Sequence, residues 1–365
     1  MTKRKIVAID AKELADEHLK SLGYSLLEVI PNLNAYDLIL LSDIEIPDKY
    51  VPRNARVIIR GKKYTGGADL LKYQLWMKHQ MIKLHVDCYY QINHFSLIHT
   101  KDIKQIVVVH DLYPLEKIEK YSFIQRLTYF VSMIGTMINA NRIFTVSNFT
   151  KNRLEHYLWK SDKIEVNYDG VDAPPHIDSL DSFSCVEGPF CLMLGRVNHY
   201  KGTMRVVTLF DKYLSDCGYK LVIAGQAETE DVISKMNEIT GRNSNIIWLN
   251  YVDNNTKEWL LRNCSLMIYA SRYDGFGVPP LEAAIRRKKV ILNDIEVLRE
   301  ISKNSGKYID FNSSDEAVIK AIMDSLSDND EKKIEAMYNI AKQYTWKHFV
   351  DKIVNAIEGS VDING

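Results

Sequence analysis

The sequence predicts an α/β protein made of two doubly wound domains, each with helices on both faces of a parallel sheet. Three observations support this fold class. Short apolar runs alternate with amphipathic segments in the first half of the chain, the alternation restarts after residue 185, and a segment containing Gly and Pro separates the two series. A chain of 365 residues also suits two cores, because single cores stop growing at roughly 250–300 residues.

The first series contains five apolar runs that we predict to be buried strands. They lie at 6–9, 38–41, 57–59, 106–109 and 143–146. Between several of these runs, segments 69–84 and 121–139 carry apolar side chains at helical spacing. Strands and helices alternating in this way make a Rossmann-like domain, which we assign to residues 1–180.

The second series has five more runs and forms a second Rossmann-like domain, assigned to residues 181–345. Its strands are predicted at 190–194, 221–224, 246–249, 266–269 and 290–292. Residues 170–188 include the Pro174-Pro175 pair and form the predicted linker, with the boundary near 180. The remaining segment, 346–365, begins with a helix from Trp346 to Ile357 that has one apolar face, and a return to the first domain is one way to cover that face.

Composition and charge narrow the class of protein. Lys plus Arg (47) equal Asp plus Glu (47), so no net field attracts nucleic acid, and we expect no nucleic-acid partner. No apolar run reaches the ~20 residues of a transmembrane helix, and Asp10, Lys12 and Glu13 interrupt the first run, so no signal-peptide core forms. We therefore expect a cytoplasmic protein, with peripheral association at the inner face of the plasma membrane left open. The five cysteines lack the spacing of a zinc site or a redox dithiol.

The most informative segment runs from Asp274 to Glu282 and follows a predicted strand. Its sequence is Asp274-Gly275-Phe276-Gly277-Val278-Pro279-Pro280-Leu281-Glu282. Two glycines permit a close approach by a ligand, and the Pro pair favours a helix start whose N-terminus would attract phosphate. Both carboxylates could accept hydroxyl groups of a sugar or a ribose. The plainer alternative is that Asp274 caps a turn and Glu282 complements a helix dipole.

A second loop, from Gly195 to Gly202, follows the strand at 190–194. It carries Arg196 and Lys201, which could hold a diphosphate between them. Taken alone the signal is weak, because exposed basic residues in loops usually only solvate the surface. The loop matches neither the Walker motif nor the dinucleotide fingerprint.

A third feature is His110, which follows the strand at 106–109. On its own, a structural histidine is an equally good interpretation. Its position in the other domain favours a residue that meets the bound sugar from the opposite side of a cleft.

At these three segments the chain resembles the retaining glycosyltransferases of family 4. Asp274 to Glu282 is similar to the family's Glu-x7-Glu signature, and Gly195-Arg196 with Lys201-Gly202 looks like its phosphate clamp. The resemblance implies the GT-B architecture, in which two Rossmann-like domains face each other across a cleft.

The resemblance also implies a role for each of these residues. Arg196 and Lys201 would bind the diphosphate, Glu282 the ribose, and His110 the donor sugar. Asp274 would bind that sugar together with the backbone of the Gly275, Phe276 and Gly277 turn, while Gly195 would belong to the donor-binding loop.

Two departures from the family pattern stand out. The first acidic position is Asp274 rather than Glu. In addition, the glycine-rich loop expected after the first strand is hard to recognise, because Ile9-Asp10 runs directly into Ala11-Lys12-Glu13-Leu14. Gly23-Tyr24 and Gly66-Gly67 are the remaining candidates for that loop.

The implied activity is transfer of a hexose from a GDP- or UDP-sugar to a glycan or lipid-linked glycan, with retention of configuration. In the front-face mechanism the departing diphosphate takes the proton of the acceptor, so no metal and no cofactor is expected. Two alternatives stay open. One is a non-catalytic sugar-nucleotide-binding partner of another transferase, and the other is an epimerase or a phosphorylase of the same architecture.

Overall fold

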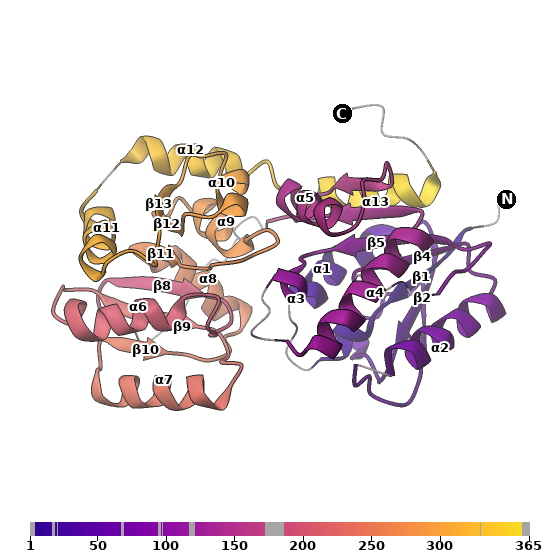
Figure 1. Ribbon diagram of the computed structural model, residues 1–365, viewed down its shortest axis with the longest axis horizontal. Helices are drawn as coiled ribbons and strands as arrows, with labels where there is room; N and C mark the ends of the chain where they lie inside the picture. Colours follow the sequence, from indigo (N-terminus) through magenta and orange to yellow (C-terminus); the bar gives the residue numbers. More distant parts are fainter. Residues whose placement is uncertain are drawn as a thin grey trace. The chain divides into compact units, whose positions relative to one another are not determined.

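The structure is a computed structural model that describes residues 4–16, 19, 21–66, 69–93, 96, 98–116, 121–171, 186–328 and 330–359. The chain divides into two compact units, Met1–Gly170 with Trp346–Gly365 and Val171–Thr345 (Figure 1). Each unit has a parallel sheet with helices, so the predicted fold class is confirmed. The predicted boundary near 180 and the Pro174-Pro175 pair fall outside the described residues.

The first unit is built on a seven-stranded parallel sheet. The strand order is β3-β2-β1-β4-β5-β6-β7. The strands are β1 (Ile6–Asp10), β2 (Asp37–Ser42), β3 (Ala55–Ile59), β4 (Cys88–Gln91), β5 (Lys104–Val109), β6 (Arg142–Thr145) and β7 (Ile164–Val166). All strands run the same way, so their carboxyl ends meet at one edge.

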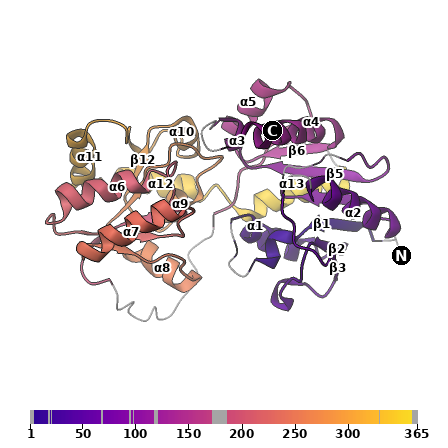
Figure 2. The ribbon, with the colours of Figure 1, turned by 60° about the horizontal axis from the view of Figure 1, so that its bottom comes forward.

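Helices cover this sheet on both faces. They are α1 (Ser21–Val29), α2 (Asp69–Lys83), α3 (Tyr113–Glu116), α4 (Phe123–Asn139), α5 (Asn148–Tyr157) and α13 (Trp346–Glu358). The connection through α1 leads from β1 to β2, whereas those through α2, α4 and α5 progress in the opposite direction along the sheet. Because crossovers are right-handed, α2, α4 and α5 share the face opposite α1. Helix α13 packs beside α1 (Figure 2).

Helix α13 is part of the first unit although it comes last in the chain. Its apolar face is buried, and the Asn167 amide donates to the Phe349 carbonyl at 3.0 Å. At its end, Glu358 accepts hydrogen bonds from Lys5 and from the Tyr36 hydroxyl, both at 2.7 Å. These contacts hold the helix against elements that begin the chain.

The second unit has a six-stranded parallel sheet in the order β10-β9-β8-β11-β12-β13. Its strands are β8 (Phe190–Leu194), β9 (Lys220–Ala224), β10 (Ile246–Trp248), β11 (Leu266–Tyr269), β12 (Val290–Asn293) and β13 (Lys307–Ile309). Its helices are α6 (Thr203–Leu209), which continues as a π-helical turn over Phe210–Leu214, α7 (Glu230–Arg242), α8 (Asn254–Asn263), α9 (Val278–Ala284), α10 (Glu296–Ile301), α11 (Asp315–Ser327) and α12 (Glu331–Ala341).

All ten predicted strands are present, and three further strands were missed. In β4 the sequence Cys-Tyr-Tyr-Gln is fully buried, but two hydroxyls and an amide interrupt the apolar pattern. Strands β7 and β13 have three residues each, too few to show a period.

The cysteines and the helices add two further observations. Cys88, Cys191 and Cys264 are buried free thiols, and burial raises the pKa of Cys88 and of Cys264 to about 12. Cys185 lies outside the described residues. Among the described helices, none has both the length and the apolar character needed to cross a bilayer.

Candidate active site

Glycines bring the loop after β8 close to the end of β11. Gly202 caps α6 with φ of 71°, and a Cβ there would lie 2.3 Å from the Ala270 carbonyl oxygen. Gly195 at the other end of the loop has φ of 124°, which L side chains rarely adopt. This close approach places Lys201 beside the loop that begins after Tyr269.

Lys201, Asp274 and Tyr269 form one hydrogen-bonded group. The Lys201 ammonium forms an ion pair with one Asp274 oxygen and lies 3.3 Å from the Tyr269 hydroxyl. That hydroxyl donates to the other Asp274 oxygen at 2.8 Å. The structure therefore joins directly two residues that the sequence predicts on separate loops, the phosphate-binding lysine and the sugar-binding carboxylate.

The charges of Lys201 and Asp274 are stabilised mainly by neighbouring side chains rather than by water. The side chains of Lys201 and Asp274 are 18% and 14% exposed. Burial alone would lower the pKa of Lys201, but the Asp274 carboxylate, together with Tyr269 and Tyr200, outweighs burial and holds that pKa above its usual range. Burial, followed by the charge of Asp274, also raises the pKa of Tyr269. Lys201 is a permanent cation at the carboxyl edge of the sheet, and Asp274 is its counterion.

The glycine turn after Asp274 leads into α9 as predicted. Gly277 caps the helix with φ of 105°, and a Cβ there would meet Leu298 at 2.9 Å. The helix starts at Val278 and carries Pro279 and Pro280 in its first turn, which suits residues that lack an N–H donor. Phe276 is buried, and its ring meets that of Tyr344 edge to face, with 5.3 Å between the ring centroids. The turn is thus fixed by packing, and Gly275 lies within it.

Arg196, the second predicted phosphate ligand, is more exposed than Lys201. Its guanidinium donates to Glu228 at 3.0 Å, and half of its side chain faces solvent. The Val197 N–H donates to the Gln226 carbonyl at 2.9 Å, which fixes the backbone beside it. The backbone is therefore anchored while the guanidinium is held only by an exposed pair, which typically contributes about 0–1 kcal/mol.

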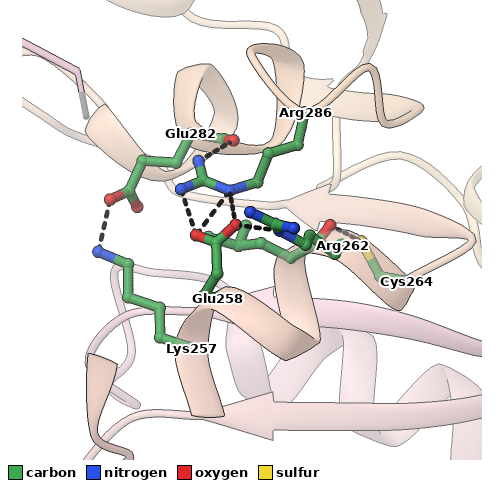
Figure 3. Close-up of polar contacts among 7 residues, drawn as sticks. Lys257, Glu258, Arg262, Cys264, Glu282 and Arg286 are labelled. Atoms are coloured by element: carbon green, nitrogen blue, oxygen red, sulfur yellow. Dashed lines mark hydrogen bonds and ion pairs between the residues drawn. The ribbon is translucent and has the colours of Figure 1, made fainter. Parts of the chain in front are cut away.

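Glu282 is buried on α9 and pairs with Lys257 of α8, not with the Lys201 group. Figure 3 shows the two side chains meeting, with Lys257 partly exposed. The Arg286 guanidinium also donates to the Glu282 carbonyl at 2.7 Å. The carboxylate predicted to bind ribose therefore has one cationic partner that can turn toward solvent.

Beneath this pair lies a buried ionic cluster that sequence reasoning missed. Glu258 accepts hydrogen bonds from Arg286 at 3.0 and 3.1 Å and also from Arg262 (Figure 3). Burial opposes charge on Glu258, but the two guanidinium groups overcome it and lower the pKa of that carboxyl. The i,i+4 spacing of Glu258 and Arg262 is visible in sequence, whereas the contact with Arg286 requires the fold. This cluster ties α8 to α9 and so positions Glu282.

His110 lies at the carboxyl end of β5 in the first unit. Its Nδ1 is 3.9 Å from an Asp169 oxygen, too far for a hydrogen bond. Burial lowers the pKa of His110 to about 4, although a hydrogen bond with the Ile92 backbone acts in the opposite direction. Burial also raises the pKa of Asp169 to about 7. Among the described residues, Nε2 of His110 has no hydrogen-bond partner. His110 is therefore neutral above about pH 4.

A charged group stands where a glycine-rich loop was expected after β1. Asp10 is buried, pairs with Lys12 at 2.9 Å and accepts from the Tyr73 hydroxyl at 3.0 Å. Lys12 opens a short 3-10 turn instead of a glycine loop. Of the two alternative glycine pairs, Gly23 lies within α1 and Gly67 falls outside the described residues.

The described part of the chain brings no three His, Cys, Asp or Glu side chains together as a metal-binding group. Asp328 and Asp330 have the spacing of an Asp-x-Asp motif but face Lys307 at 3.9 Å and Lys333 at 3.3 Å. Independence from metal remains a prediction.

Residues 183–344, less than half of the chain, match the family described as glycosyl transferases group 1. The O-antigen chain mannosyltransferase B of Escherichia coli is 24% identical over 238 residues, which cover 62% of each chain. Across three curated relatives, the match spans 46–62% of their length.

Two solved structures show the same fold over the whole chain. WaaG, a glycosyltransferase involved in lipopolysaccharide biosynthesis, superposes with a TM-score of 0.76 at 14% identity, covering 97% of this chain and 100% of WaaG. Anabaena Alr3699/HepE in complex with UDP and glucose superposes with a TM-score of 0.75 at 14% identity, and the match covers 98% of this chain and 100% of HepE. The GT-B fold is thereby confirmed. The predicted resemblance to glycosyltransferases is confirmed as well, since residues 183–344 match the glycosyl transferases group 1 family.

Proposed function

We propose that this protein transfers a hexose from a nucleotide-diphosphate sugar to a glycan or lipid-linked glycan and retains the anomeric configuration. The observation that carries the proposal is the contact between Lys201 and Asp274 at the carboxyl edge of the second sheet. Open α/β sheets bind ligands at that edge. A fixed cation and a carboxylate side by side suit a diphosphate joined to a polyhydroxylated ring.

Each group of the site has a matching part of the donor. Lys201 and Arg196 would bind the diphosphate, and the exposed pair between Arg196 and Glu228 can open at little cost. Asp274 would accept hydroxyl groups of the sugar, and Glu282 those of the ribose. His110, neutral above about pH 4, would offer its Nε2 lone pair to a sugar hydroxyl.

The same cations supply the electrostatic part of the reaction. As the bond between the sugar and the diphosphate breaks, negative charge grows on the leaving phosphate. Lys201, already desolvated and oriented by Asp274, stabilises that charge without a large rearrangement. The departing phosphate then takes the proton of the acceptor hydroxyl on the same face, so that configuration is retained and no metal is required.

The activities of similar proteins guide the choice of donors. The Escherichia coli relative is a mannosyltransferase, and HepE has been solved with UDP-glucose. We therefore propose either a GDP- or a UDP-sugar as donor for this chain.

Thermal shift measurements with UDP-glucose, GDP-mannose and ADP-glucose test donor binding, because a ligand that binds only the native state raises its melting temperature. We expect one of these donors to raise the melting temperature of the intact chain, and Lys201→Ala to abolish most of the rise. Absence of a shift with every donor would refute a donor site in this unit.

A non-catalytic, donor-binding protein is the second candidate. It is favoured by the Asp10 and Lys12 pair, which stands where a glycine loop was expected in the first unit. Incubation of bound donor with water and with glycan acceptors separates the two candidates. Release of free nucleotide supports transfer or hydrolysis, whereas intact donor after long incubation with the acceptors supports the binding protein.

A further inference from the structure

Helix α4 is apolar on both its buried and its exposed sides. Tyr129, Met133 and Met137 pack into the core of the first unit. On the outer side, exposed fractions range from 48% to 75% for Phe123, Ile124, Leu127, Val131 and Ile138. A helix that is apolar all round is normally covered on every side. Something in addition to this sheet is therefore expected to cover α4.

Three hydroxyl groups of α4 are satisfied within the helix, and Tyr129 and Asn139 donate to backbone carbonyls of neighbouring segments of the same unit. The hydroxyls of Thr128, Ser132 and Thr136 each donate to the carbonyl one turn earlier, at 2.7–3.0 Å. The Gln125 side chain accepts from the Ser122 N–H in a capping box. Such a helix needs few hydrogen bonds from its surroundings, which suits an apolar medium.

Helix α2 presents a second apolar strip on the same face of the sheet. Leu71, Leu75 and Ile82 are more than half exposed. The strips of α2 and α4 together define the α2–α4 surface. It contains eight of the twelve most exposed large apolar side chains among the described residues. Scattered apolar residues need no explanation, but a concentration of this kind marks an interaction surface.

The charges on the two helices all favour an anionic partner. Arg126 is the one charged residue in the sequence of α4. On α2, Lys72 and Lys83 are exposed, and the acid at its start, Asp69, is buried and paired with Arg60. Aliphatic side chains and Phe with cations nearby match a lipid surface, whereas protein interfaces are enriched in Tyr, Trp and Arg at their centres.

We infer that the α2–α4 surface docks this protein on a bilayer that contains anionic lipid. Helix α4, about 25 Å long, lies in the plane of the interface with Phe123, Ile124, Leu127 and Val131 among the acyl chains. Lys72 and Lys83 remain at the level of the phosphates. The sequence leaves peripheral association with a membrane open, and this inference commits to it and names the surface responsible.

The test uses co-sedimentation of the full chain with vesicles of phosphatidylcholine, with and without phosphatidylglycerol. The patch variant combines Ile124→Glu and Leu127→Glu. The matched control combines Tyr213→Glu and Tyr251→Glu, which changes the net charge equally at exposed aromatic residues of the second unit. We expect the intact chain and the control to bind phosphatidylglycerol vesicles, and the patch variant to bind at least about tenfold more weakly.

A second pair of variants separates apolar contact from charge. Ile124→Ser with Leu127→Ser should also lose binding, although it adds no negative charge, whereas Lys72→Glu with Lys83→Glu should lose chiefly the preference for anionic vesicles. Circular dichroism melting should be unchanged in the variants of the α2–α4 surface, because their substituted side chains are exposed.

Three outcomes would overturn the inference. The intact chain fails to bind either vesicle, the patch variant binds as well as the control, or the patch variant loses self-association in sedimentation with no change on vesicles. The last result would assign the surface to contact between copies. Because the assay contains no donor or acceptor, its failure leaves the transfer proposal intact, and failure of transfer leaves a vesicle result standing.

Discussion

Asp274→Asn tests the centre of the proposed site, because it keeps the shape of the side chain and removes the counterion of Lys201. Considered alone, the sequence predicts that this change leaves the fold untouched. The ion pair alters that expectation, since the ammonium would remain in a mostly buried position without its partner. Breaking a fully buried pair costs about 3–5 kcal/mol, and exposed pairs contribute about 0–1 kcal/mol.

The exposures of 18% and 14% place this pair between those limits. We expect a loss of about 2 kcal/mol, which for a unit of this size lowers the melting temperature by roughly 4–8 °C. Lys201→Met with Asp274→Asn removes both charges and should recover part of that loss. Asp274→Glu keeps the charge, so it should be the best tolerated of the three in both stability and transfer.

Nucleotide affinity gives the sharper readout. In Asp274→Asn the ammonium of Lys201 no longer has a competing partner, so GDP or UDP should bind more tightly, while transfer falls because the sugar has lost its carboxylate. Lys201→Met should weaken the same nucleotides. Calorimetric titration of both variants checks the two directions. If Asp274→Asn weakened nucleotide binding, or if the two single changes added without coupling, the ion pair would not control this site.

Three further predictions concern other residues. Arg196→Ala should weaken nucleotide-diphosphate binding by about 1.5–3 kcal/mol and leave nucleoside binding nearly unchanged, whereas Glu228→Ala, which frees the guanidinium, should not weaken it; equal titration curves for wild type and Arg196→Ala would contradict the clamp. Transfer should survive EDTA, and a loss of turnover restored by manganese or magnesium would count against the proposed mechanism. Burial raises the pKa of Asp169 to about 7, so the stability that its protonated form contributes is lost as pH rises from about 4 through 7. The melting temperature of Asp169→Asn should therefore rise relative to that of wild type across this range. Parallel curves of melting temperature against pH for the two proteins would argue against a buried, protonated Asp169.

Much of the fold was predictable because parallel sheets leave a strong pattern in the sequence. Strands buried on both faces appear as uninterrupted apolar runs, and apolar runs mark all ten predicted strands. The expectation of burial fails for the edge strands β3 and β10, which are only partly buried. The pattern fails where a strand is short, as in β7 and β13, or where buried hydroxyls interrupt it, as in β4. Helix α4 shows a different limit. Its helical spacing is clear, but the sequence does not show which of its apolar residues face the core.

The candidate site was predictable as loops but not as contacts. Glycines and prolines mark the turns after β8 and β11, because only certain residues tolerate those backbone angles. The pairing between the loops depends on Gly202 pressing against Ala270, which places Lys201 next to Asp274. No spacing in the chain encodes a contact between residues 73 positions apart. The link from Glu258 to Arg286 is hidden for the same reason.

The ion pair between Lys201 and Asp274 adds a third interpretation of Asp274 to the two that the sequence offers. As a turn cap it would be a local feature, and as a sugar ligand it would wait for the donor. The structure shows a third role, in which Asp274 and Tyr269 both contact the Lys201 ammonium and hold it in place. A lysine kept charged and oriented needs little reorganisation when phosphate takes over as its partner. In the proposed reaction the carboxylate would then be released for the sugar, so one contact would prepare both halves of the proposed donor site.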